Sequence, residues 1–148
     1  MRVSRSSYMK HDLVKEPHVV NIEDLTTKNT NFRTAEWTGE FLQMTTMSIA
    51  VGGEVGFEIH KDTDQFLRIE SGTARVVMGR DKNNLDFEKE AKDDDAIFVP
   101  SGYWHNIHNT GDEPLKLYSI YAPPHHPVGT VHETYEIAMK AEEEEDHS

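Results

Sequence analysis

Two imidazoles, a carboxylate and an amide are spaced in this sequence so that β-structure can bring them together. Glu58 and His60 are separated by one residue, so on a strand both side chains point to the same face. Gln65 follows after a short connection, and His105 lies in a second stretch, residues 100–109 (PSGYWHNIHN). Nitrogen and oxygen donors of these types together form a set that can hold one divalent metal ion.

The absence of cysteine narrows this chemistry. The chain has no cysteine among its 148 residues, which excludes disulfides, thiolate catalysis and thiolate metal sites. Any metal must therefore be held by histidine, carboxylate and amide ligands. The length fits a single domain with a core that needs no covalent staple.

Charge and hydropathy exclude several classes of partner. The formal net charge is −12, from 27 acidic and 15 basic residues, and a nucleic acid or an anionic membrane would require a basic face. No apolar run approaches the length of a membrane span, and residues 1–13 lack the apolar centre of a signal peptide. We therefore expect a cytoplasmic protein that binds neither nucleic acid nor membrane. The acidic run 142–146 is expected to be a solubilising tail.

The elements that must position the candidate ligands are predicted to be short strands. Apolar and β-favouring residues alternate in short runs that are separated by turn residues. We expect strands within 36–51, 54–60, 64–72, 73–79, 85–91, 96–100, 104–109 and 115–122. Eight or nine strands at this spacing indicate an antiparallel sandwich or barrel and not βαβ units.

The connections give three further predictions. Ser71-Gly72 is expected to be a hairpin turn between adjacent strands, and 26–34 to be a loop by composition. One helical turn with an asparagine cap is expected at 21–25. The only longer helix is predicted over 130–143, where strong helix formers predominate.

With these residues in place, the chain resembles the cupin superfamily of small jelly-roll barrels. The family's first motif is Gly, five residues, His-x-His, three or four residues, Glu, six residues, Gly. The stretch from Gly52 to Gly72 matches that spacing throughout, with Glu58 at the first histidine position and Gln65 at the glutamate position. The second motif fits residues 94–109, where only the leading glycine is replaced, by Asp94.

The resemblance implies an all-β, single-domain jelly-roll barrel with a short C-terminal helix. The barrel core would cover 36–122, between an N-terminal arm, 1–35, and a proline-rich segment, helix and acidic tail, 123–148. More narrowly, the chain is similar to small bacterial cupins of the conserved-barrel type (cupin 2) that have no assigned reaction. The resemblance also implies a homodimer, for which the arm is a candidate swapped element and the outward-facing Phe57, Ile59 and Phe66 need cover.

For the site, the resemblance implies that Glu58, His60, Gln65 and His105 point into the barrel and bind one divalent ion of iron, manganese, nickel or zinc. Glu58 and His105 are the candidate catalytic residues. Alternatives stay open, because Glu58 can act as a base without metal and Gln65 can bind the substrate instead. The expected function is metal-dependent isomerisation or dioxygenation of a small polar metabolite such as a sugar or sugar acid. The alternative is a binding protein without turnover.

Side chains around the barrel mouth complete the predictions. Residues 123–132 are expected to fold over the mouth, where His126 or His132 would act as acid or base. Candidate lining residues are the aromatic side chains of Tyr103, Trp104 and Tyr121. Arg68 is predicted to face outward and to form a salt bridge or a subunit contact, and the alternative role is to bind an anionic substrate.

Overall fold

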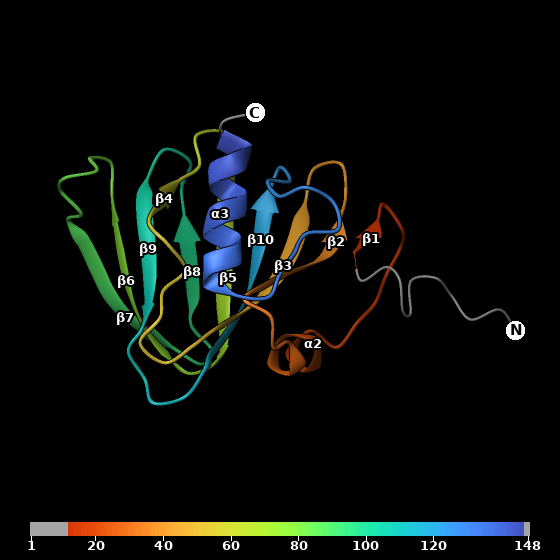
Figure 1. The fold of residues 1–148 in the computed structure, drawn as a ribbon, viewed down its shortest axis with the longest axis horizontal. Helices are drawn as coiled ribbons and strands as arrows, with labels where there is room; N and C mark the ends of the chain where they lie inside the picture. Colours follow the sequence, from red (N-terminus) through yellow and green to blue (C-terminus); the bar gives the residue numbers. More distant parts are fainter. Residues whose placement is uncertain (1–11, 147–148) are drawn as a thin grey trace, which may run out of the picture.

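The computed structural model describes residues 12–146, which form two facing β-sheets with one helix across their opening and a second helix against the central strands of the larger sheet (Figure 1). This architecture is the predicted all-β jelly roll with a short C-terminal helix. None of the described helices is long and apolar enough to cross a membrane.

The larger sheet has seven strands and provides most of the inner surface. Its order is β1-β2-β3-β10-β5-β8, and β11 pairs with β2. All of its pairings are antiparallel except that of β1 with β2. The strands are β1 Leu13–Val14, β2 Arg33–Thr38, β3 Gln43–Ile49, β5 Asp64–Ser71, β8 Ala96–Val99, β10 Leu115–Ala122 and β11 Val131–His132.

The smaller sheet has four antiparallel strands in the order β4-β9-β6-β7. These strands are β4 Glu58–Ile59, β6 Thr73–Gly79, β7 Phe87–Lys92 and β9 Trp104–Asn109. Two α-helices accompany the sheets, α2 Ile22–Lys28 and α3 Tyr135–Asp146. Asn21 caps α2 by accepting a hydrogen bond from the backbone of Asp24, as the sequence predicted.

The inner face of the large sheet changes from apolar to polar along the barrel axis. At one end, Met47, Leu117 and Ile69 stand opposite one another on three neighbouring strands, and all are fully buried. Four residues further along β10, Tyr121 lies between Gln43 and Gln65. Strand alternation therefore places a dry core at one end and a row of buried polar groups at the other.

Helix α3 closes the space between the sheets. Ala138 is fully buried, and Tyr135 packs edge-on against Phe32, which precedes β2. On the other side, a side chain at Gly56, just before β4, would meet Met139 at 3.1 Å. The helix thus contacts segments that lead into both sheets, and in Figure 1 it crosses the front of the barrel.

The predicted hairpin at Ser71-Gly72 is wrong. Strand β5 pairs with β10 and β8, whereas β6 pairs with β9 and β7, so the chain crosses between sheets at this point. Gly72 has φ +104, and a Cβ there would lie 3.1 Å from the Leu115 backbone. The turn residues were recognised correctly, but local sequence does not reveal which strands pair.

Three predicted boundaries also move. The expected loop 26–34 is wrong at both ends, because α2 continues to Lys28 and β2 begins at Arg33. The predicted helix 130–143 begins only at Tyr135, because Val131–His132 pair with β2 as β11 and the Thr134 hydroxyl caps the helix.

The strand expected over 54–60 is mostly irregular. Only Glu58–Ile59 form β4, together with a single bridge between Glu54 and His108. Gly56 interrupts the extended backbone between them with φ +120.

Candidate metal centre

The two motif segments are held together by backbone pairing. Strand β4 pairs with β9 so that Glu58 stands directly opposite His105. The backbone N–H of Gly102, in the turn before β9, donates to the carbonyl of His60 at 2.8 Å. The Asp64 carboxylate also accepts a hydrogen bond from the backbone of Ser101 at 2.9 Å. Backbone pairing and the Asp64 carboxylate therefore fix the two motifs against each other.

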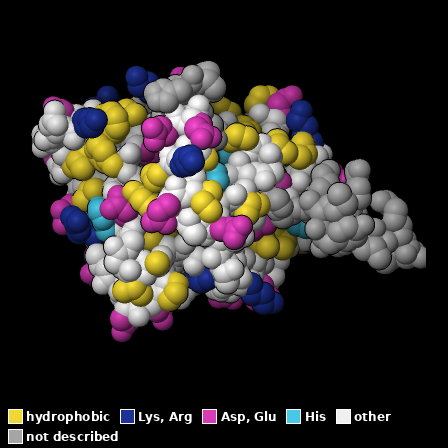
Figure 2. All heavy atoms as spheres, viewed as in Figure 1, with side chains coloured by type: hydrophobic (Ala, Val, Ile, Leu, Met, Phe, Trp, Pro, Cys, Tyr) yellow, Lys and Arg dark blue, Asp and Glu magenta, His cyan; other side chains and the backbone are white. Residues whose placement is uncertain are grey.

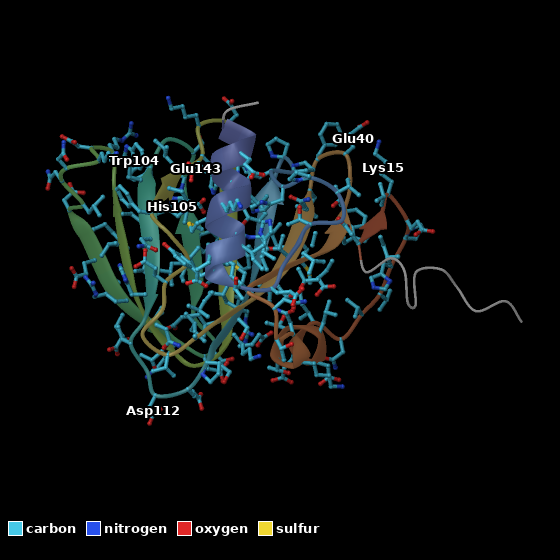
Figure 3. The ribbon with its side chains drawn as sticks, viewed as in Figure 1. Lys15, Glu40, Trp104, His105, Asp112 and Glu143 are labelled. Atoms are coloured by element: carbon cyan, nitrogen blue, oxygen red, sulfur yellow. The ribbon has the colours of Figure 1, made fainter. Side chains whose placement is uncertain are left out.

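Glu58, His60 and His105 converge on one point. The Glu58 Oε1 atom lies 3.3 Å from His60 Nε2 and 3.7 Å from His105 Nε2. One ligand atom from each residue lies within 4.8 Å of the others. For a tetrahedral or octahedral ion with bonds near 2.1 Å, neighbouring ligand atoms are about 3.0–3.4 Å apart. The spacing therefore fits one ion after a small adjustment of the side chains. Figure 3 shows His105 on β9, within the barrel.

Apart from one another, the three candidate ligand atoms have no partner in the protein. Glu58 Oε1, His60 Nε2 and His105 Nε2 are buried, and none has a hydrogen bond within the protein. The other nitrogen of His105, Nδ1, lies 3.0 Å from the carbonyl oxygen of Tyr103. Because a carbonyl only accepts, Nδ1 carries the proton and Nε2 keeps its lone pair for the centre. This pattern is that of metal ligands.

Gln65 lies on the same inner face, in the polar row beside Tyr121. Its Nε2 donates to the Ser119 hydroxyl at 3.2 Å, which leaves the amide oxygen without a partner. The ring of Tyr121 is in turn 5.9 Å from that of His60. The structure thus places a buried acceptor in the same part of the barrel, and ligation by Gln65 remains a prediction.

The electrostatics favour an ionised Glu58. Burial by itself raises the pKa of this carboxyl, but the adjacent imidazoles of His105 and His60 and the charge of Arg33 outweigh it, so the pKa lies well below its usual value. The carboxylate is therefore charged at neutral pH and suits a metal ligand.

The segment 123–132 lies at the site, but a different histidine from those predicted approaches it. The ring of His125 lies 4.1 Å from that of His60. The Gln43 side chain holds the segment by accepting from the backbone of His125 and His126. Sequence reasoning missed His125 because face alternation does not apply outside a strand.

The two predicted acid–base histidines have other partners. His126 is buried, and its Nε2 lies 3.2 Å from the Tyr121 hydroxyl. Burial and the charge of Arg33 hold the pKa of His126 well below its usual value, so this imidazole is neutral. His132 contacts Arg33, with 3.2 Å between Nδ1 and Nη1.

Arg33 is the second residue that sequence reasoning missed. Its side chain is 0% exposed, and it forms an ion pair with Glu142 of α3 at 3.0 Å. The polar composition of residues 26–34 predicted a loop at Arg33. Its partners, His132 and Glu142, lie 99 and 109 residues away in the chain. No local signal in the sequence identifies such a pairing.

The remaining predictions concern the aromatic side chains expected at the barrel mouth and the ion pair of Arg68. Tyr121 is fully buried inside the barrel. Trp104, labelled in Figure 3, instead stacks on Phe57 with ring centroids 5.0 Å apart and lies under Lys82. Arg68 forms the predicted ion pairs, with Glu70 and Asp94.

Comparison with known proteins identifies the relationship. A family model described as Cupin domain matches residues 45–121. The uncharacterized Bacillus subtilis protein YrkC is 54% identical over 144 residues, which cover 94% of this chain and 77% of that protein. An uncharacterized protein of Acanthamoeba polyphaga mimivirus is 38% identical over 115 residues, covering 77% of this chain and 70% of the relative.

Solved structures agree with this relationship. A crystal structure from Bacillus halodurans superposes with a TM-score of 0.84 at 60% identity, covering 84% of this chain and 95% of that one. An oxalate decarboxylase from Bacillus subtilis is similar at a TM-score of 0.54 and 22% identity, over 60% of this chain and 23% of its own. The second likeness shows the fold alone.

The buried phenol of Tyr121 gives a pH-dependent prediction. Burial raises its pKa to about 12, against about 10 in the unfolded chain. The neutral form is therefore favoured by folding, and its contribution to stability is complete below pH 10 and lost as the pH rises toward 12. In a phenolate absorbance titration of the folded protein, the difference between wild type and Tyr121→Phe should have its midpoint near pH 12. A midpoint near pH 10 in protein that still shows its native circular dichroism contradicts the prediction.

Proposed function

This chain belongs to the cupin family, and on that premise we propose that it binds one divalent metal ion and acts on a small polar metabolite. Glu58, His60 and His105 are the proposed ligands, with the Gln65 amide oxygen as a fourth, neutral one. The observation that carries the proposal is the convergence of three buried ligand atoms that have no other partner. A catalytic centre needs ligands on one side and open positions on the other, and a barrel mouth provides both.

The donor set restricts the ion and its chemistry. One carboxylate and two neutral imidazoles suit iron, manganese, nickel or zinc in the divalent state. When bound, such an ion supplies Lewis acidity or activates water or dioxygen. Because the chain has no cysteine, no thiolate shifts the preference toward soft metals.

Three side chains of the protein have proposed roles in binding the metal or in transferring protons. Glu58 is ionised and serves as a ligand, or as a base when it is not bound to metal. His105 is oriented by the Tyr103 carbonyl and presents Nε2 to the centre. His125, whose ring contacts that of His60, is placed better than His126 or His132 to exchange protons with a substrate at the mouth.

Two reaction types fit this arrangement, isomerisation of a sugar or sugar acid and oxygen-dependent cleavage. The alternative function is that of a binding protein without turnover, in which the site has lost its metal and holds a small ligand such as a sugar. Metal analysis of protein purified without a metal-binding tag and without chelator separates them. Close to one ion per chain supports the proposed enzyme, whereas protein free of metal supports the binding protein.

Removing either imidazole tests the ligand assignment. We expect His60→Ala and His105→Ala each to abolish metal retention, because two remaining donors hold a divalent ion weakly. The matched control is His108→Ala. His108 lies on β9 with His105, but it is half-buried near Glu54 and faces away from the centre. The measurement is metal per chain by elemental analysis after gel filtration. If both site variants keep wild-type metal content, the ligand assignment is wrong.

We also propose that two chains form a homodimer. A row of large apolar side chains crosses the outer face of the larger sheet in register, formed by Trp37, Met44, Ile120, Phe66 and Phe98. Residues 13–25 lie over the end of the row at Trp37, whereas Phe98 is 69% exposed. A second copy related by a two-fold axis offers the same apolar row and can cover it.

Sedimentation equilibrium tests the dimer. We expect Phe98→Asp to weaken association at least tenfold, because a charge would be desolvated in the interface. Phe41→Asp is the matched control, since Phe41 is 74% exposed on the turn before β3. Monomeric wild-type protein, or a dimer that Phe98→Asp leaves unchanged, contradicts the proposal.

The cytoplasmic location expected from the sequence stays a prediction.

A further inference from the structure

Gln43 is a buried amide at the polar end of the barrel. It begins β3, and strand pairing places it opposite Thr38 of β2 and Tyr121 of β10. The residue is 0% exposed. A primary amide has two N–H donors and an oxygen with two lone pairs, and each one that is buried without a partner costs free energy. The partners of Gln43 therefore show what this side chain holds in place.

All four hydrogen-bonding positions of the Gln43 amide are in use. Oε1 accepts from the backbone N–H of His125 at 3.0 Å and from that of His126 at 2.9 Å. Nε2 donates to the backbone carbonyl of His126 at 2.9 Å and to the Thr38 hydroxyl at 3.1 Å. Because a backbone N–H only donates and a carbonyl only accepts, a single orientation of the amide satisfies these partners. Three of the four bonds go to two consecutive residues that follow β10.

A second side chain anchors the other end of the same segment. Asp12 is buried, and one of its carboxyl oxygens accepts from the backbone N–H of Gly129 at 2.8 Å. The Thr38 hydroxyl lies 3.0 Å from both of these oxygens and also receives the bond from Gln43. One connected network therefore holds residues 125–129 at both ends against β2 and β3.

The segment held in this way places the His125 ring against a proposed metal ligand. The ring centroids of His125 and His60 are 4.1 Å apart, with their planes inclined at 61°. The fully buried Tyr121 stacks on His125 at 5.7 Å and contacts His126 edge-on at 5.1 Å. His125 is exposed, whereas His60 is only 5% exposed. The His125 ring therefore covers His60 on its solvent side.

We propose that Gln43 is a positioning residue, which fixes the backbone at His125 so that this imidazole covers His60 at the mouth of the candidate centre. The inference rests on the proposed function, which gives His125 a part in proton exchange, and adds the residue that sets its place. Without the Gln43 amide, the N–H groups of both residues and the carbonyl of His126 lose their partner in the barrel. They regain partners by turning to water, and this movement carries the His125 ring away from His60.

Carbethoxylation of His60 by diethyl pyrocarbonate tests the inference in chelator-treated, metal-free protein, with each histidine followed by peptide mass spectrometry. Little histidine surface is visible on the face shown in Figure 2, and the exposed His18 serves as the internal reference. We expect wild-type His60 to react about tenfold more slowly than His18, because it is covered. Gln43→Met keeps the length of the side chain without its hydrogen bonds. This variant and His125→Ala should each speed the reaction of His60 about fivefold or more, the value of one hydrogen bond.

The double variant separates positioning from general loosening of the fold. If Gln43 acts through His125, Gln43→Met adds nothing to the reaction rate of His60 once residue 125 is already alanine. General loosening instead adds to the effect of His125→Ala, because the two changes are then independent.

Asn109→Leu is the matched control. Asn109 is also a buried amide that holds backbone groups, but it lies at the other end of β9 from the candidate centre. It donates to the carbonyls of Ile49 and Glu113 and accepts from the backbone of Gly111. The variant should leave the reaction rate of His60 within about twofold of wild type, since distant sites act independently.

Folding and metal content are measured on the same samples. If Gln43→Met lacks native circular dichroism, Gln43→Asn replaces it with the same expectation, because its amide is one methylene too short to reach the segment. Unchanged reactivity of His60 in the Gln43 variant, additive effects in the double variant, or equal rates for wild-type His60 and His18 overturn the inference while the metal site stands. Wild-type protein purified without metal overturns the proposed function instead, and the carbethoxylation rates still test the position of His125.

Discussion

Lone pairs that face one another inside a barrel repel, and either a proton on an imidazole or a metal ion between them relieves that repulsion. Glu58 Oε1 and the Nε2 atoms of His60 and His105 are all acceptors when the histidines are neutral, and they are buried at separations of 3.3 and 3.7 Å from the carboxylate. Such a cluster is repulsive by itself, because each group has lost its water. A divalent ion resolves this for all three atoms at once. The turn contacts and strand pairing hold these side chains in an arrangement that fits one ion.

The rest of the interior is organised by the same need to satisfy buried charge. The polar row on the larger sheet lies at the end of the barrel where the imidazoles gather, and the apolar layers lie at the other end. Arg33, which stands opposite Met47 on the inner face, has Glu142 as its counter-charge, so helix α3 is attached to the barrel by an ion pair as well as by packing.

The sequence predicted those features that depend on local pattern or fixed spacing. Strands β9 and β10 occur at their expected residues because turn signals bound a clear apolar alternation. Glu58, His60 and His105 come together because motif spacing reflects the geometry of a barrel. Arg33, by contrast, pairs with residues about a hundred positions away, and no feature of its polar stretch of the chain indicates that pairing. The strand exchange at Gly72 and the position of His125 were missed for the same reason, since both depend on which distant segments pack together.

The central claim is that one metal ion lies between Glu58, His60 and His105. The most direct measurement is an X-ray fluorescence scan of crystals grown without chelator, followed by an anomalous difference map collected above the absorption edge of the metal found. We predict a single strong peak within bonding distance of the carboxylate and both imidazoles. Fluorescence without a transition metal, or a peak elsewhere with none between these side chains, would contradict the account.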